Sequence, residues 1–448
     1  MAGKKEFRRD ARCRLGWISS VIACIFFVAD TALAQEEAKK VVRDGAIAVV
    51  TREIYMPYPK EGQSYVITNQ YTGHQGTKLL QVRTLQVHDD VYQDAALRFS
   101  TDNGRTWTPF QRDPERDIRV KDGQAREPYI FGACHDPEAN RMVRTTLMRT
   151  HKGDPRKGGL SSYADHTLWQ TSTDDGNTWD APKLLKYEDG GDYLAEDFGN
   201  ADYLDHNRSY SGYNVISLGE GGVATAYCRN VSFVNEKGET ENVCGVVLAV
   251  GRWDKTKNTY QWTHSNPVAV SLAMSDRGLM EPWVAQLSNG DLLVDMRGNA
   301  TKINPGRNFY ALSKDGGKTL GDARELKFDD GTQFYAPSSL SMMLRHSKTG
   351  VLYWFGNLSD QPTSGNSPRY PLYIAEIDEA KPAIRRETLT IIDDYDPKTQ
   401  TAAVQFSNFS LVENRETRDF DLYMTVWGEF PNVYQANAYK YVVKLKVR

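Results

Sequence analysis

The feature that most constrains the fold of this chain is an internal repeat, the pattern S-x-D-x-G-x-T-[W/L]. Its copies occupy residues 100–107, 172–179 and 313–320. The first two copies begin 72 residues apart and the next gap is 141 residues, which one degenerate copy around residues 250–262 would explain. Self-similarity at a fixed period is typical of proteins built from repeated structural units, so we expect a repeat architecture.

Each copy predicts a tight turn between two β-strands. Its Asp side chain can accept hydrogen bonds from the backbone, and its Gly can adopt a positive φ. Short apolar segments such as 95–99 and 168–170 precede the first two copies, and similar segments recur between Gly, Asn, Asp and Pro residues. We therefore assign these turns a structural role.

The spacing of the repeat predicts the number of blades. A unit of about 70 residues fits about six times into the chain that follows residue 34, and no segment there has sustained helical periodicity. Six four-stranded blades around one axis close into a ring. The sequence therefore predicts an all-β fold, a six-bladed β-propeller of four-stranded antiparallel blades that forms a single domain over residues 35–448.

Residues 1–34 have the three parts of a secretory signal peptide. Six Lys and Arg side chains precede residue 18, an apolar run covers residues 18–28, and Ala32-Leu33-Ala34 forms a small-residue cleavage site. A membrane anchor is the alternative, but the apolar run is shorter than a membrane span and Asp30 interrupts it. We expect a secreted or periplasmic protein with no integral membrane span after signal removal.

The composition excludes several classes of function. Hydrophobic residues make up 40% of the chain, mean hydropathy is −0.58 and no second long apolar run occurs, which argues against a polytopic membrane protein. The net charge is −3 and no basic stripe stands out, so nucleic acid is not an expected partner. The sequence indicates no cofactor and does not indicate an oligomeric state.

The cysteines give no sign of a metal site. Of the five Cys residues, Cys134, Cys228 and Cys244 lie beyond the signal. Cys228 and Cys244 flank a predicted hairpin at 231–241, where they would form either a disulfide or two unbridged thiols. The close Cys and His spacing of zinc sites does not occur. The acidic run 188–192 could bind Ca²⁺, although turns of this composition are usually just solvated.

The repeated pattern resembles the Asp boxes, or BNR repeats, of the sialidase (neuraminidase) superfamily. A longer match is E-P-x-x-x-x-L-x-x-G-x-L-L-x-x-x-R at residues 281–297, and the stretches 352–374 and 405–429 are similar to later segments of that family. The resemblance covers about residues 80–430. It implies a secreted glycoside hydrolase with a six-bladed propeller and a glycan or oligosaccharide as its substrate.

The resemblance also implies roles for four residues. Arg297 and Arg369 match two of the three arginines that hold the substrate's carboxylate through forked, charge-assisted hydrogen bonds. Asp94, six residues before Ser100, matches the general acid/base, and strand alternation would place it at the axis-facing end of its strand. Glu281 matches the Glu that deprotonates a nucleophilic Tyr, an exception to the two-carboxylate rule for glycosidases.

Two positions depart from the family pattern. Phe406 stands where the family has its nucleophilic Tyr, and a phenyl ring has no oxygen with which to attack. Tyr335 is a candidate to fill this gap, although it also fits a packing aromatic at the start of a blade. The first of the three carboxylate-binding arginines has no clean match, and Arg52, Arg83 and Arg126 are the candidates.

Three functions remain open on the sequence. The first is a sialidase-like hydrolase of a glycan with an acidic sugar, in which Glu281 activates a Tyr or, in an inverting reaction, water; an inverting pair of carboxyls lies about 6.5–9.5 Å apart. The second is a non-catalytic glycan-binding propeller, which Phe406 favours. The third is a propeller polysaccharide lyase with His88, His135 or His206 as its base, and no spacing selects one of them.

Overall fold

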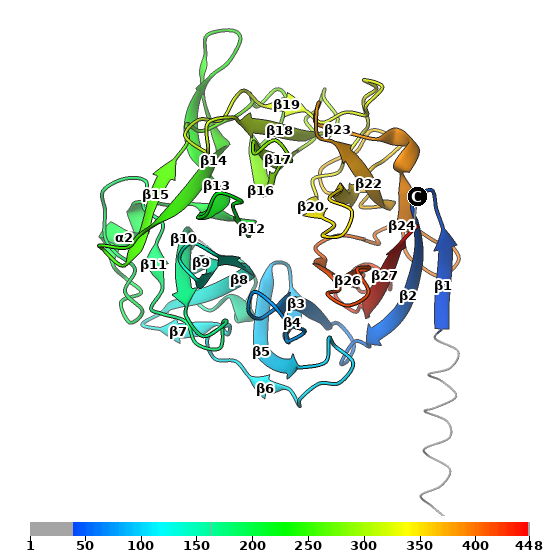
Figure 1. The fold of residues 1–448 in the computed structure, drawn as a ribbon, viewed down its shortest axis with the longest axis horizontal. Coiled ribbons are helices and arrows are strands. Elements are labelled where there is room, and N and C mark those ends of the chain that lie inside the picture. Colours follow the sequence, from blue (N-terminus) through cyan, green and yellow to red (C-terminus); the bar gives the residue numbers. More distant parts are fainter. Residues whose placement is uncertain (1–38, 162, 447–448) are drawn as a thin grey trace, which may run out of the picture. The chain divides into compact units, whose positions relative to one another are not determined.

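The computed structural model describes residues 39–161 and 163–446. Val41–Arg448 forms one compact unit. Its strands form six antiparallel sheets arranged around a common centre (Figure 1). The prediction of a six-bladed β-propeller is therefore confirmed. The predicted signal peptide, residues 1–34, lies outside the described residues. Within the described ranges, no helix is both long enough and apolar enough to cross a membrane.

The first three blades follow one another along the chain. The first contains β3 (Ser64–Tyr71), β4 (Leu79–His88), β5 (Val91–Ser100) and β6 (Gln111–Arg112). The second contains β7 (Arg119–Lys121), β8 (Gln124–Asp136), β9 (Arg141–Lys152), β10 (Tyr163–Ser172) and β11 (Lys183–Leu184). The third contains β12 (Tyr210–Ser217), β13 (Val223–Val234), β14 (Thr240–Asp254) and β15 (Thr259–His264). Two short helical turns, η1 (Pro155–Lys157) and α2 (Ala201–Asp205), lie in the connections.

The remaining blades complete the ring. The fourth contains β16 (Leu279–Gln286), β17 (Leu292–Gly298), β18 (Asn308–Ser313) and β19 (Arg324–Glu325). The fifth contains β20 (Met342–Arg345), β21 (Leu352–Asn357), β22 (Leu372–Asp378) and β23 (Ala383–Ile384), and β24 (Thr390–Asp393) also pairs with β22; η2 (Arg386–Thr388) precedes β24. The sixth contains β1 (Lys39–Asp44), β2 (Ala48–Met56), β27 (Ala438–Leu445), β26 (Phe420–Thr425) and β25 (Ser410–Glu413).

The sixth blade closes the ring because it combines strands from both ends of the described chain. β2 pairs with β27 from Ala48 opposite Leu445 to Met56 opposite Ala438. The first and last parts of the sequence are thus hydrogen-bonded in one sheet, which leaves no break between the first and sixth blades (Figure 1).

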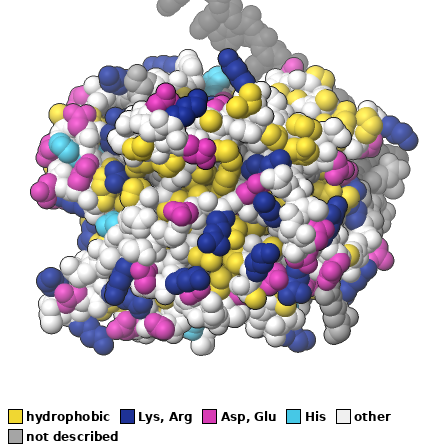
Figure 2. Space-filling view, turned by 90° about the horizontal axis from the view of Figure 1, so that it is seen from above, with side chains coloured by type: hydrophobic (Ala, Val, Ile, Leu, Met, Phe, Trp, Pro, Cys, Tyr) yellow, Lys and Arg dark blue, Asp and Glu magenta, His cyan; other side chains and the backbone are white. Residues whose placement is uncertain are grey.

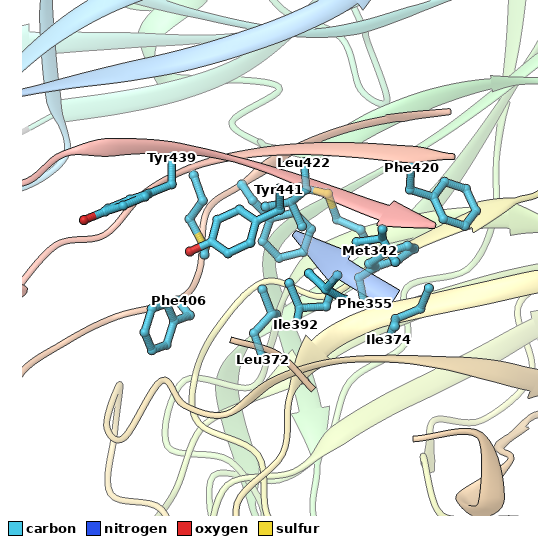
Figure 3. Close-up of a cluster of buried hydrophobic side chains, with 14 of the residues drawn as sticks. Met342, Phe355, Leu372, Ile374, Ile392, Phe406, Phe420, Leu422, Tyr439 and Tyr441 are labelled. Atoms are coloured by element: carbon cyan, nitrogen blue, oxygen red, sulfur yellow. The ribbon is translucent and has the colours of Figure 1, made fainter. Parts of the chain in front are cut away.

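Apolar side chains pack between neighbouring blades. One cluster lies between the fifth and sixth blades, and its fully buried members include Phe355, Phe406 and Tyr441. Figure 3 shows these rings with their aliphatic neighbours, among them Met342, Leu372, Ile374, Ile392 and Leu422. Full burial of a large apolar side chain stabilises the fold by about 1.5–3 kcal/mol, so these contacts hold the blades at a fixed angle.

The repeated pattern forms a hydrogen-bonded turn. In the first copy, the Ser100 hydroxyl accepts a bond from the Gly104 backbone N–H at 2.8 Å, and Asp102 accepts one from the Thr106 backbone N–H at 2.8 Å. The Trp107 indole N–H donates to the Gly104 carbonyl at 3.0 Å. The bonds to Ser and Asp recur in the other two copies. Hydrogen bonds from Thr106 hold the pKa of the Asp102 carboxyl far below its usual value.

These turns occupy one face of the ring. They join β5 to β6, β10 to β11 and β18 to β19, and the predicted degenerate copy at 250–262 spans the corresponding β14–β15 hairpin. Because neighbouring strands are antiparallel, the connections that come directly before these hairpins, namely β4–β5, β9–β10, β13–β14 and β17–β18, lie on the opposite face. The repeated turns are therefore remote from that second face, which carries the candidate site.

Charged side chains of both signs are mixed over the surface. On the face shown in Figure 2, Lys and Arg side chains alternate with Asp and Glu side chains around a band of apolar surface. This distribution agrees with the balanced composition of 55 basic and 58 acidic residues.

The cysteines are free thiols in the structure. Cys228 of β13 lies opposite Val246, whereas Cys244 of β14 lies opposite Asn230, so the two Cys residues are offset along the ladder by two positions. Cys134, Cys228 and Cys244 form no disulfide. Of the two alternatives for Cys228 and Cys244, the structure therefore has the unbridged thiols.

Asp295 of β17 gives the fold a predicted pH dependence. Its carboxyl group is buried and accepts a hydrogen bond from the Ser341 hydroxyl, and burial raises its pKa to about 7. The unfolded chain releases this proton near the ordinary pKa of about 3.9. Between these two values the folded state binds more protons, so its stability falls as pH rises.

We expect Asp295→Asn to remove this dependence. In urea unfolding, the wild-type protein should lose about 2–4 kcal/mol relative to the variant between pH 4 and pH 8. His166, whose pKa burial lowers to about 4, titrates in both proteins and so cancels in the difference. A difference that stays constant with pH would contradict the assignment.

Candidate functional site

Glu281 and Arg297 come together at one end of the fourth blade. Arg297 lies in β17 opposite Met280 of β16, and the ladder is irregular between Met280 and Trp283. Glu281 falls in this bulge with a φ of 49°, which turns its side chain out of the alternation of the strand. Its Oε2 atom lies 3.0 Å from Nη1 of Arg297. The bulge therefore builds an ion pair that regular pairing would not make.

Arg369 joins this pair through a shared acceptor. The carbonyl oxygen of Ser338 accepts a hydrogen bond from Arg297 at 2.9 Å and another from Arg369 at 2.8 Å. Arg369 also donates to Gln405 Oε1 at 3.1 Å and to Ser407 Oγ at 3.2 Å. Both arginine residues are 8% exposed, and the Nε atom of each has no hydrogen-bond partner among the described residues.

The two arginines differ in how their charge is balanced. Burial lowers the pKa of Arg297, but the charge of Glu281 together with smaller contributions from Tyr213, Tyr210 and Cys228 outweighs burial, and the pKa is raised. The pKa of Arg369 is lowered, chiefly by burial and also by the charge of Arg297. No carboxylate in the described part of the chain lies within ion-pair distance of Arg369. A buried cation without an ion-pair partner is unfavourable, so this position favours an added anion.

Two tyrosines of β12 extend the cluster from the third blade. The Tyr213 hydroxyl lies 3.4 Å from Glu281 Oε1 and 2.8 Å from the Tyr210 hydroxyl. The ladder of β12 is irregular between Ser211 and Val215, which includes Tyr213. Burial raises the pKa of Tyr213 well above its usual value, and the charge of Glu281 adds to this effect. Tyr213 is therefore protonated unless a base accepts its proton.

Gly212 allows β12 to approach the fourth blade. A Cβ atom at this position would lie 2.6 Å from the Ala226 carbonyl oxygen and 2.7 Å from the Pro282 carbonyl oxygen. Both neighbours are backbone atoms, which cannot move aside as a flexible side chain can. The absence of a side chain at Gly212 thus lets Tyr213 reach Glu281.

The turn between β4 and β5 brings two carboxylates toward the same cluster. Asp89 and Asp90 form the tip of this hairpin, and the Tyr129 hydroxyl donates to the Asp90 carbonyl at 2.6 Å. Partial burial raises the pKa of Asp89, the charge of Asp90 raises it further, and Arg369 lowers it. The charge of Asp90 also acts on Arg369 and on Tyr213. The sequence alone assigns neither Asp89 nor Asp90 a role.

Asp94 lies elsewhere. It is exposed, has a φ of 53°, and its backbone N–H donates to Asp117 Oδ1 at 3.2 Å. Its charge acts on Arg156 of η1. The β4–β5 ladder shifts register at Asp94, because Arg83 pairs with Ala96 whereas Leu85 pairs with Gln93, so simple strand alternation does not give the direction of the Asp94 side chain. The structure thus brings Glu281, Arg297 and Arg369 together and places Asp94 in a separate group.

Phe406 packs in the core, and its neighbours reach the arginine. Phe406 is fully buried between the fifth and sixth blades (Figure 3). Alternation along the chain turns Gln405 and Ser407 the other way, toward Arg369. Tyr335 packs against Arg307, with its ring centre 4.5 Å from the guanidinium carbon, so it has the packing role.

None of the three further arginine candidates contacts Arg297 or Arg369 in the described residues. Arg52 pairs with Asp393 at the end of β24 in the fifth blade, at 3.0 Å from Asp393 Oδ2. Arg83 lies over aromatic rings of the first blade. Arg126 is buried and donates to backbone carbonyls of the connection that follows β11.

Of the three histidines of the lyase alternative, His88 is the last residue of β4 and directly precedes the Asp89–Asp90 turn, whereas the other two contact residues outside this cluster. His135 stacks on His74, with ring centres 4.4 Å apart. The Nδ1 atom of His206 lies within hydrogen-bond distance of the backbone oxygen and the carboxylate of Asp202. In the described ranges, no three His, Cys, Asp or Glu side chains are grouped so that they could hold a metal ion.

Comparison with known proteins gives the fold. No family model matches the sequence, and no curated protein matches it. A protein of unknown function from Dyadobacter fermentans is similar over 88% of this chain and 99% of its own, at 13% identity and a TM-score of 0.51. An intramolecular trans-sialidase from Ruminococcus gnavus matches 88% of this chain and 98% of its own, at 11% identity and a TM-score of 0.49. The Hadza microbial sialidase Hz136 matches 84% and 66%, at 15% identity and a TM-score of 0.48.

The incomplete neutralisation of Arg369 predicts selective binding of anions. Sodium glucuronate or N-acetylneuraminate at about a hundred times its Kd should raise the Tm of the wild-type protein by at least about 2 °C. Arg369→Met should abolish this rise, and glucose should not produce it. Equal stabilisation of the wild-type protein and the variant in a thermal melt would contradict the prediction.

Proposed function

We propose that the protein is an exported glycoside hydrolase that acts on a glycan bearing an acidic sugar. The observation that carries this proposal is Arg369, a buried residue whose guanidinium has no ion-pair partner among the described residues, and which lies beside a Glu and a Tyr in hydrogen-bond range of each other. A sugar carboxylate would supply the missing anion through forked hydrogen bonds. The predicted signal peptide supports export.

Glu281 and Tyr213 supply a nucleophile in this proposal. An anionic carboxylate would be repelled by an anionic sugar, whereas a neutral Tyr is not. The Tyr213 oxygen attacks the anomeric carbon while its proton passes to Glu281 Oε1, and a glycosyl-tyrosine bond forms as the bond to the leaving oxygen breaks. Water then attacks the anomeric carbon and the glycosyl-tyrosine bond breaks; the hydroxyl of the water stays on the sugar, the remaining proton passes to the carboxylate that protonated the leaving oxygen, and the Tyr213 oxygen recovers its proton from Glu281.

The Asp89–Asp90 turn supplies the proton donor. A general acid has to hold its proton near the working pH, and the raised pKa of Asp89 is in the required direction. Asp90 contributes the like charge that raises it. The competing assignment places the acid at Asp94, which the family resemblance indicates.

Two alternatives make different predictions at Tyr213. In an inverting enzyme Glu281 would activate water directly, so Tyr213 would be dispensable. In a non-catalytic glycan-binding propeller, neither residue would matter for turnover, because no turnover would occur. Phe406, at the position of the family's nucleophilic Tyr, favours the non-catalytic binding protein only if no other Tyr acts as the nucleophile. Tyr213 lies beside the Glu281 carboxylate and is available for this role.

The test of the nucleophile is a screen of the mature protein against aryl glycosides of sialic acids, uronic acids and neutral sugars. We expect the protein to cleave an acidic glycoside and to retain the configuration at the anomeric carbon. Proton NMR of the first product formed measures this configuration. Tyr213→Phe and Glu281→Gln should each lower kcat by about 10²–10⁴. Tyr210→Phe, which removes only the neighbouring hydroxyl, is the matched control and should have a smaller effect. Full activity in Tyr213→Phe with an inverted product would favour the water mechanism.

A second set of variants locates the acid. Asp89→Asn, Asp90→Asn and Asp94→Asn are compared on a glycoside with a poor alkyl leaving group, which needs protonation. We expect Asp89→Asn to lower kcat by about 10²–10⁴ and to remove the alkaline limb of the pH profile. Asp90→Asn should shift that limb to lower pH, because the like charge that raises the Asp89 pKa is gone. A loss confined to Asp94→Asn would reject this assignment in favour of Asp94.

A further inference from the structure

Three aromatic side chains lie on the rim next to the Asp89–Asp90 turn. Tyr58 follows β2, and Phe430 and Tyr434 lie in the connection from β26 to β27. The rings of Tyr58 and Phe430 are 5.6 Å apart in an edge-to-face arrangement, and each of the three side chains is partly exposed. We refer to Tyr58, Phe430 and Tyr434 as the rim aromatics.

The strand pairing places the rim aromatics at the same edge as the acidic turn. Tyr434 lies two residues before Ala436, which bridges to Ser64 at the start of β3. Ser64 pairs with Gln86 of β4, and Asp89 follows three residues later. Burial raises the pKa of Tyr434, and the charges of Asp89 and Asp90 raise it further, in agreement with this neighbourhood.

The chain also holds Tyr58 at this edge. Met56, the last residue of β2, pairs with Ala438 at the start of β27. The backbone N–H of Tyr58 donates to Asn437 Oδ1 at 3.2 Å. The segment after β2 and the β26–β27 connection are thus tied together where the sixth blade meets the first.

We propose that the rim aromatics bind the sugar on the leaving-group side of the cleaved bond, and that this sugar is neutral. This inference rests on the proposed function. A general acid works within about 2.6–3.2 Å of the oxygen that it protonates, so the leaving group has to lie beside the acidic turn. Tyr and Phe rings present flat apolar faces on which the C–H face of a hexose can pack. The Asp90 carboxylate of the turn would repel a second acidic sugar.

The proposal gives the substrate class a second feature. The acidic sugar would contact Arg369, and the next residue of the chain would be a neutral hexose held by Tyr434 and its neighbours. An oligosaccharide would then be a better substrate than the same acidic sugar joined to a small alcohol, because part of its binding energy comes from the rim aromatics.

The kinetic test compares two probes, 3′-sialyllactose and the methyl α-glycoside of N-acetylneuraminic acid. The kcat/KM for 3′-sialyllactose, divided by that for the methyl glycoside, should fall about three- to tenfold in Tyr434→Ala. The reason is that the lactose part of the first probe loses its stacking partner. Tyr434→Phe keeps the ring and is the matched control, with an unchanged ratio. Tyr58→Ala should lower the ratio in the same direction.

A binding arm separates this proposal from the proposed function. Saturation-transfer NMR with free lactose needs no turnover, and we expect its ring-proton signals in the wild-type protein and in Tyr434→Phe but weakened in Tyr434→Ala. Failure of the wild-type protein to cleave either probe would count against the proposed function, and the NMR result alone would then decide the subsite. An unchanged kcat/KM ratio or unchanged lactose signals in Tyr434→Ala, or an equal loss in Tyr434→Phe, would overturn the subsite.

Discussion

Two arginine side chains are buried side by side on the carbonyl oxygen of Ser338, and within the part of the chain that the structure describes only Arg297 has a carboxylate partner. Arg297 is neutralised by Glu281, which leaves the charge of Arg369 balanced only by more distant carboxylates and by neutral acceptors. A folded protein that keeps such a charge out of water gives up stability at that point. The chemistry proposed for this face depends on that imbalance, because a substrate carboxylate would remove it.

The propeller is suited to build this arrangement because every blade sends its connections to the same two faces. The repeated turns with Ser, Asp and Gly secure one face, and the opposite face is free to carry irregular structure. Bulges in β12 and β16 are the irregularities that matter, since they release Tyr213 and Glu281 from strand alternation. Regular strands would have sent these side chains into the interfaces between blades.

The sequence was sufficient for the fold and for part of the site. The spacing of the repeated pattern and the residue types of its turns predicted six blades, because both can be read from local sequence. The degenerate copy at 250–262 falls in the β14–β15 hairpin, as expected. Glu281, Arg297 and Arg369 were found through a family resemblance, and they lie together. Asp94 was expected beside them by strand alternation, which a register shift in the β4–β5 ladder interrupts. Tyr213 could not be found from the sequence, because its approach to Glu281 depends on a bulge and on contact between two blades.

The central claim is that Arg369 is the anchor for the carboxylate of an acidic sugar. The most direct measurement is a crystal structure of the protein soaked with N-acetylneuraminate or glucuronate. The account predicts both carboxylate oxygens within hydrogen-bond distance of the Arg369 guanidinium, with the anomeric carbon facing Tyr213. A sugar bound on this face with its carboxylate turned toward solvent, or bound only at another part of the ring, would contradict it.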